Sequence, residues 1–213
     1  MACVLDHLVV VAPTLEHGAA HVARQTGFVM RAGGRHPQMG THNLLLRLGE
    51  SVFLEVIALD RAARRPENAR WFGLDGQTRV RADWAAGRRL RGFVARTSML
   101  GPLLGREGAA LGQQRRVSRG DRAWDFAVRA DGSWPLDGAA PCLIDWGARG
   151  PAALDMPISG ARLQRVLIEC PDPEAAAGCY QAIGLADPPA LRRGPHTRLL
   201  AVIETPQGER ILS

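Results

Sequence analysis

The segment LDHLVVVAPTLEHGAAHVARQTG, residues 5–27, opens a unit that the chain repeats. Its apolar run at 5–11 predicts a strand, and Thr14 can then cap a helix over 15–26 that stops at Gly27. Apolar runs between turn residues predict three further strands, at 28–31, 43–48 and 52–59. The unit is therefore β-α-β-β-β.

The same order of elements follows twice more. The second copy has a strand at 90–96, a helix at 101–111 and strands near 115–118, 123–129 and 142–146. The third has a strand at 163–170, a helix at 173–183 capped by Asp172 and a hairpin of 197–204 with 209–212. Its second strand, around Leu191, is weakly marked, so we expect this copy to be partial.

This repetition predicts an α+β protein. Two βαβββ modules side by side give a curved mixed or antiparallel sheet, with helices on the convex face and the concave face open to a ligand. A partial third module follows. We place module one at 1–60, module two at 90–147 and the third module at 161–213. The first connector, 61–89, should contain a short helix near 66–72, and the second connector is 148–160.

Length and composition indicate an ordinary globular chain. It has 213 residues, of which 46% are hydrophobic and 23% charged. No apolar run approaches the roughly 20 residues that cross a bilayer, and no signal peptide is visible, so we expect a cytoplasmic protein without a membrane partner. The four cysteines form no Cys-x-x-Cys pair and are interpreted as free, mostly buried thiols.

The net charge of +6 raises the question of nucleic-acid binding. All 27 basic residues are arginine, spread in ones and twos rather than in a stripe with interleaved aromatic residues. We interpret this usage as compositional and expect no nucleic-acid partner. The alternative is that 88–91 or 115–116 meets an acidic partner or a substrate carboxylate.

Two ionisable residues stand inside apolar strands of the first unit. They are His7, in the strand at 5–11, and Glu55, in the strand at 52–59. An unpaired polar group buried there would cost about 2–7 kcal/mol, so each side chain should be coordinated or hydrogen-bonded. Either the two satisfy each other or they form a functional site. The glycine-rich segment 33–43, expected to be a turn, adds imidazole and amide groups between them.

These residues resemble the glyoxalase-like branch of the vicinal oxygen chelate superfamily. The similarity is carried by LDHLV at 5–9, GGRHP and GTHN within 33–43, and LEVIA at 54–58. The resemblance implies that His7 and Glu55 bind a divalent ion such as zinc, manganese, nickel or iron, leaving positions open for two vicinal substrate oxygens. It also implies a small-molecule substrate and a possible homodimer.

The second module departs from the family pattern. Asp145 falls in its last strand, where a carboxylate ligand belongs, but its first strand offers only Gly92-Phe93-Val94. A complete set of four metal ligands from the two modules is therefore missing. Asp145 is a candidate third ligand or general base, and an ordinary strand-end residue otherwise.

Further candidates surround this pair. His36 could orient or protonate the substrate, or could be a solvated loop residue. Four more are candidate substrate-binding residues, each with an ordinary structural role as the alternative: His42, Asn43, Arg96 and Trp146. His17 and His21, one helical turn apart, are expected on an exposed helix face rather than at a metal.

The favoured function is that of a glyoxalase-like enzyme with lyase or isomerase chemistry on a small vicinal-dioxygen substrate. His7 and Glu55 would hold the metal, and His36 and Asp145 would move protons. The alternative is a metal-free protein of the same fold that sequesters a small hydrophobic or aromatic molecule.

Overall fold

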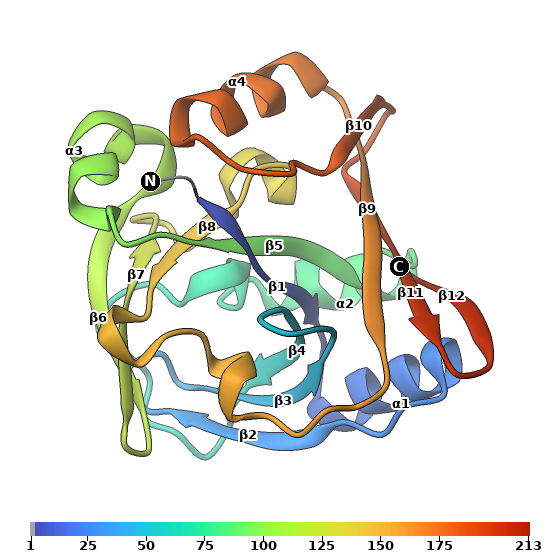
Figure 1. Ribbon diagram of the computed structural model, residues 1–213. Helices are drawn as coiled ribbons and strands as arrows, with labels where there is room; N and C mark the ends of the chain where they lie inside the picture. Colours follow the sequence, from blue (N-terminus) through green and yellow to red (C-terminus); the bar gives the residue numbers. More distant parts are fainter. Residues whose placement is uncertain (1–2) are drawn as a thin grey trace.

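The computed structural model describes residues 3–213 and contains two sheets. The larger has eight strands in the order β2-β3-β4-β1-β5-β8-β7-β6 and curls into an incomplete barrel (Figure 1). The first module supplies β1 (Val4–Val11), β2 (Arg31–His36), β3 (Thr41–Arg47) and β4 (Phe53–Leu59). The second supplies β5 (Leu90–Arg96), β6 (Gln113–Arg119), β7 (Arg122–Val128) and β8 (Cys142–Asp145).

The two modules have the same strand order. In each, the first strand pairs in parallel with the fourth, and the third and second strands continue outward to an edge. The modules join where β1 and β5 pair antiparallel at the centre of the sheet. The α+β architecture of paired βαβββ modules is therefore confirmed.

The third repeat forms a sheet of its own. It contains β9 (Arg162–Cys170), α4 (Pro173–Ile183), β10 (Ala190–Arg193), β11 (Arg198–Thr205) and β12 (Gly208–Leu212). Asp172 caps α4 as expected, by accepting a hydrogen bond from the Ala175 backbone N–H. Its first strand lies between the second and third strands, unlike the other two modules, and β10 is only four residues long.

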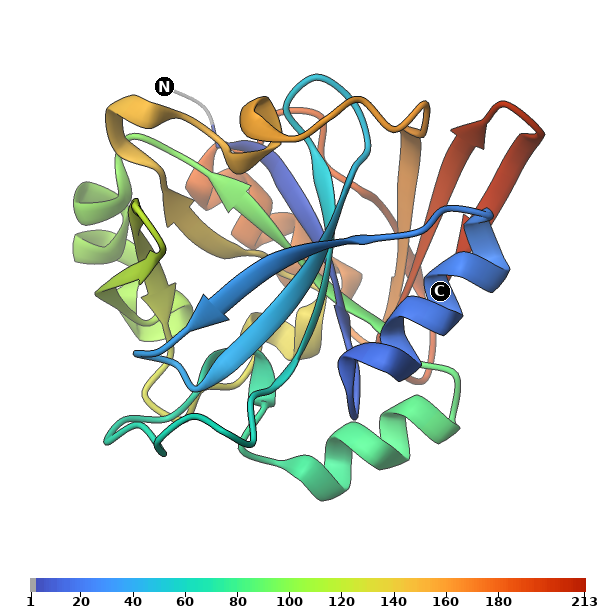
Figure 2. The same ribbon diagram turned by 90° about the horizontal axis from the view of Figure 1, so that it is seen from below.

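Three helices accompany the large sheet, and their ends follow the capping residues. Thr14 caps α1 (Leu15–Thr26), and Gly27 ends it in a left-handed conformation. The others are α2 (Gln77–Ala85) and α3 (Leu100–Leu111), with short 3-10 turns at Trp71–Gly73, Pro135–Gly138, Gly147–Arg149 and Ala152–Asp155. Helix α1 packs against β3 and β4 and extends to β12, as Figure 2 shows. Within residues 3–213, no helix is both long and apolar enough to cross a membrane.

Strand alternation separates two hydrophobic layers. Leu8 and Val10 belong to the layer between the sheet, the helices and the third repeat, whereas Val9 and Val11 belong to the layer inside the curved sheet. His7 shares its face with Val9, and Glu55 shares its face with Phe53 and Ile57, which are also inside. Both ionisable side chains therefore lie on the concave face.

Three local predictions need correction. Only residues 37–40 of the glycine-rich segment 33–43 form a turn; residues 33–36 belong to β2 and residues 41–43 to β3. Gly33 leaves room for Asn43 of the neighbouring strand, since a Cβ at Gly33 would lie 2.1 Å from Asn43 Oδ1. Where a short helix was expected near 66–72, the first connector has a 3-10 turn at Trp71–Gly73, and its α-helix lies further on, at Gln77–Ala85. His21 is buried, because α1 packs against the C-terminal strand and His21 Nε2 contacts the Ser213 carbonyl at 2.9 Å.

Candidate active site

His7 is held from two sides on β1. Its ring stacks on Phe53 with centroids 4.4 Å apart, and its Nδ1–H donates to Asp6 Oδ1 at 2.6 Å. The pairing of β1 with β5 shifts register between Leu5 and His7, an irregularity that re-aims adjacent side chains. Because Nδ1 carries the hydrogen-bonded proton, the lone pair of the neutral ring is on Nε2.

Asp6 is fully buried and is itself fixed by two donors. Its Oδ2 accepts a hydrogen bond from Trp146 Nε1 at 2.9 Å, and Arg96 Nη1 lies 3.6 Å away. Removing this carboxylate from water is tolerable because every neighbour is a donor or a cation. Sequence reasoning missed Asp6, although its position in an apolar strand beside His7 was a usable signal.

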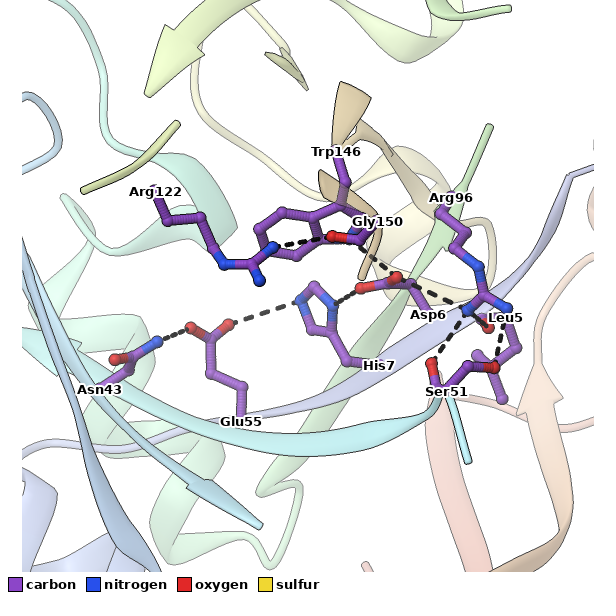
Figure 3. Close-up of polar contacts among 10 residues, drawn as sticks. All are labelled: Leu5, Asp6, His7, Asn43, Ser51, Glu55, Arg96, Arg122, Trp146 and Gly150. Carbon is purple, nitrogen blue, oxygen red and sulfur yellow. Dashed lines mark hydrogen bonds and ion pairs between the residues drawn. The ribbon is translucent and has the colours of Figure 1, made fainter. Parts of the chain in front are cut away.

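Glu55 faces the other nitrogen of His7. Its Oε2 lies 3.6 Å from His7 Nε2, and its Oε1 accepts a hydrogen bond from Asn43 Nδ2 at 2.5 Å. Figure 3 shows the resulting row of contacts, from Trp146 through Asp6 and His7 to Glu55 and Asn43. The structure thus brings together four of the sequence-predicted residues: His7, Asn43, Glu55 and Trp146.

The spacing of His7 and Glu55 fits a shared divalent ion. Imidazole nitrogen and carboxylate oxygen ligate such ions at about 2.0–2.2 Å, so two ligand atoms on one ion lie about 3–4 Å apart. The Nε2 to Oε2 separation of 3.6 Å falls in that range. Metal-bound histidines commonly donate their second N–H to a carboxylate, as His7 does to Asp6. Across residues 3–213, however, no group of three His, Cys, Asp or Glu side chains is arranged to hold an ion.

Module two does not add metal ligands to His7 and Glu55 at the corresponding positions. Gly92 lies four residues before the end of β5, as His7 does before the end of β1, and Cys142 is placed relative to Gly92 as Glu55 is to His7. The Trp134 ring covers Gly92 so closely that a Cβ there would lie 2.5 Å from it. The equivalent half of the concave face is therefore packed with apolar side chains.

His36 is buried among aromatic rings instead of lying in a solvated loop. It stands edge-on to Trp71 and Trp124, and its Nδ1 contacts the Thr41 hydroxyl at 3.1 Å. Burial, reinforced by the nearby Arg119 cation, lowers the pKa of His36 to about 3. The ring is neutral at physiological pH, and this makes it a poor proton donor.

Three other sequence-predicted residues lie apart from the row of contacts or at its edge. His42 alternates with Asn43 along β3 and is on the face that α1 covers. Asp145 alternates with Ile144 of the inner layer, and its Oδ1 accepts from the Gly147 backbone N–H at 2.8 Å. Arg96 binds the carbonyls of Leu5 and Ser51 in addition to its contact with Asp6.

A cavity of about 1020 Å³ lies beside the row of contacts. It is lined by residues of the two contacting edge strands β2 and β6, and residues 149–159 of the second connector form part of its wall. Arg119 lines it and donates to Asn43 Oδ1 at 3.4 Å, so this side chain separates the cavity from Glu55. Arg119 and its neighbour Arg122 were not predicted, because their positions depend on how the sheet closes.

Comparison with known proteins identifies the fold and the family. A hypothetical protein from Staphylococcus aureus superposes with a TM-score of 0.64 at 10% identity, covering 93% of this chain and 88% of that one. Methylmalonyl-CoA epimerase from Mycobacterium tuberculosis gives 0.42 at 13% identity, over 68% of this chain and 89% of that one. A mutant 4-hydroxymandelate synthase from Streptomyces coelicolor superposes with a TM-score of 0.41 at 16% identity, covering 99% of this chain and 62% of that one.

No curated protein sequence matches the chain significantly. The sequence does match the family described as the glyoxalase-like domain over residues 5–184, which includes both modules of the large sheet and continues to the end of α4. This agrees with the resemblance carried by the first module. The chain therefore belongs to the glyoxalase-like domain family.

Proposed function

We propose that this protein is a glyoxalase-like enzyme that acts on a small vicinal-dioxygen substrate and uses one divalent ion held by His7 and Glu55. The single observation behind the proposal is the 3.6 Å separation of His7 Nε2 and Glu55 Oε2 on the concave face. Each side chain is also oriented by a buried partner, Asp6 or Asn43. An ion such as zinc, manganese, nickel or iron, when bound, would supply Lewis acidity to the substrate oxygens.

The protein's own groups prepare the site in three ways. Asp6 keeps the proton on His7 Nδ1, so that Nε2 presents its lone pair towards Glu55. Asn43 fixes one carboxylate oxygen of Glu55 and leaves Oε2 available. Phe53 stacks on His7, Trp146 donates to Asp6, and both rings belong to the apolar inner layer, which strengthens electrostatic interactions with a polarised substrate.

Metal titration tests the proposal. Chelator-treated protein should bind manganese, nickel, zinc or iron(II) at one ion per chain in calorimetry. His7→Ala and Glu55→Ala should each abolish that binding. His42→Ala is the matched control, since His42 is in the same module but on the opposite face of the sheet. No binding to the wild-type protein, or binding that survives both site variants, would contradict the proposal.

A second candidate function is favoured by the packing of module two. The position in module two that mirrors His7 is Gly92, which has no side chain, and the Trp134 ring fills the space above it. A protein with one polar half-site could sequester a small molecule without a metal, using His7 and Glu55 as hydrogen-bonding groups. Absence of metal binding, together with tight ligand binding that depends on His7 and Glu55, would favour this candidate over the enzyme.

A further inference from the structure

The cavity beside the proposed site, here called the arginine pocket, is lined by six arginines. They come from both edge strands of the large sheet, from β3 and β7, and from the connector that follows β8. The six are Arg31, Arg35, Arg47, Arg119, Arg122 and Arg149. Such a concentration of cations in one concave surface attracts anions.

Three of these arginines are already paired with carboxylates of the protein. Arg35 Nη1 lies 3.0 Å from Asp60, and Arg149 Nη1 lies 2.9 Å from Asp121. Arg122 pairs with Asp155 and donates to the Gly150 carbonyl. These guanidinium groups are therefore largely neutralised from within the protein.

A fourth, Arg47, is engaged by backbone. It donates to the carbonyl oxygens of Gly49, Glu50 and Met156 at 2.7–2.9 Å. These bonds join the β3–β4 turn to the connector, so Arg47 has a structural task.

Arg31 and Arg119 remain. In residues 3–213, no carboxylate lies within 4 Å of either guanidinium group. Arg31 is paired directly with Leu45 of the inner layer, so its side chain is on the concave side of the sheet. Arg119 reaches across from β6 to β2, where its Cδ would lie 2.9 Å from a Cβ at Gly34.

The state of Arg119 is consistent with an anionic ligand. Burial lowers the pKa of Arg119, and the attraction of Glu55 only partly opposes this. Its face is covered by the Trp124 ring, with the guanidinium carbon 5.9 Å from the ring centroid. A planar, preoriented guanidinium of this kind is suited to bind a carboxylate through two parallel hydrogen bonds.

Part of the lining of the pocket is apolar. Val29 and Ile158 line it with 85% and 86% of their surfaces exposed, and Phe28, Met156 and Pro157 stand beside them. Large apolar side chains that gather at the mouth of a cavity are typical of ligand-binding surfaces. The lining of the pocket therefore combines cationic and apolar side chains.

We propose that the arginine pocket binds an organic carboxylate with an apolar body, with the carboxylate on Arg119 and the apolar body against Val29 and Ile158. Arg31 adds to the positive field at the entrance. The inference rests on the proposed function in one respect: Arg119 contacts Asn43, which orients Glu55, so the bound carboxylate would belong to the substrate of that site.

Binding of hexanoate to chelator-treated protein, measured by calorimetry, tests this inference without reference to metal or turnover. Hexanoate should bind at one molecule per chain, and its neutral amide, hexanamide, should bind at least about tenfold more weakly, because charge-assisted hydrogen bonds are lost. Raising the salt concentration should weaken hexanoate binding and leave hexanamide binding unchanged.

Three variants locate the carboxylate. Arg119→Gln should weaken hexanoate binding about 10- to 100-fold, the range expected for loss of a charge-assisted pair. Arg31→Gln, at an exposed position, should weaken it several-fold. Arg149→Gln is the matched control, because its guanidinium lines the same pocket but is paired with Asp121, and it should change affinity less than twofold.

Thermal melts without ligand show whether each variant folds. Equal binding of hexanoate and hexanamide would overturn the inference. So would wild-type hexanoate affinity in folded Arg119→Gln and Arg31→Gln proteins. The hexanoate result does not depend on the metal titration, since hexanoate binding is measured on metal-free protein. The two proposals can therefore fail separately.

Discussion

Modules one and two share a backbone plan but differ on the concave face. The positions that hold His7 and Glu55 in module one correspond to Gly92 and Cys142 in module two, and Trp134 covers that glycine. One half of the curved sheet therefore presents hydrogen-bonding groups, and the other presents packed rings. Two modules with the same strand order can therefore differ in chemistry, since the backbone hydrogen bonds of a sheet do not specify which side chains project from its face.

The largest expected effect concerns the packing of module two. Trp134→Ala should lower the free energy of unfolding by about 3–5 kcal/mol, because it leaves a cavity above Gly92. Urea denaturation measures this. Trp84→Ala, at a half-buried tryptophan on α2, is the control and should cost less. A loss below about 1 kcal/mol for Trp134→Ala would show that this half is not a tightly packed counterpart of the polar half.

The pH dependence of the free energy of unfolding tests whether His36 belongs to the polar half of module one or to its core. The folded pKa of about 3 lies below the ordinary histidine value of 6.5, so the folded state disfavours protonation. The contribution of the neutral His36 ring to the free energy of unfolding is therefore fully present above pH 6.5. It is lost as the pH falls towards 3, by up to about 1.4 kcal/mol per pH unit. By pH 5 the loss should be about 2 kcal/mol.

Unfolding measured at pH 7, 6 and 5 tests this slope. His36→Asn should remove most of it, although the variant is less stable throughout, whereas His17→Asn on the exposed part of α1 should keep it. An unchanged slope in His36→Asn would mean that His36 is accessible to protons, and would return it to the list of candidate proton donors.

A smaller effect probes the support of Glu55. Asn43→Ala removes the donor to Glu55 Oε1 and should lower the free energy of unfolding by about 1.5 kcal/mol, because a buried carboxylate oxygen loses its partner. Metal affinity should fall about 10- to 100-fold. His42→Ala, one residue away on the other face, should change neither quantity greatly. Unaltered metal affinity in Asn43→Ala would remove the reason for treating Asn43 as part of the site.

The smallest effect is expected at the counterpart of Glu55. Burial raises the pKa of the Cys142 thiol well above its ordinary value, so the group stays protonated and unsuited to a cation. Cys142→Ala should cost about 1 kcal/mol of stability and leave metal affinity unchanged. Loss of metal binding in this variant would make module two a ligand donor and would end the contrast between the modules.

Much of the architecture could be predicted from local patterns. Thr14 and Gly27 marked the ends of α1, and Asp172 marked the start of α4, because caps satisfy backbone groups close in sequence. The four cysteines are free, as their spacing indicated. Strand β2 at Gly33 was misjudged because this glycine makes room for Asn43, a partner that local sequence does not reveal.

The repeated β-α-β-β-β order and the face on which His7 and Glu55 lie could both be predicted from sequence patterns. Both follow from short-range periodicity, which the backbone enforces every two residues in a strand. The tertiary contacts alone place Asp6 and Asn43 where they orient this pair, Trp134 where it fills the matching half, and Arg119 in the pocket with no carboxylate within 4 Å among residues 3–213. Those contacts join residues from different strands, and their geometry depends on how far the sheet curls before its edges meet.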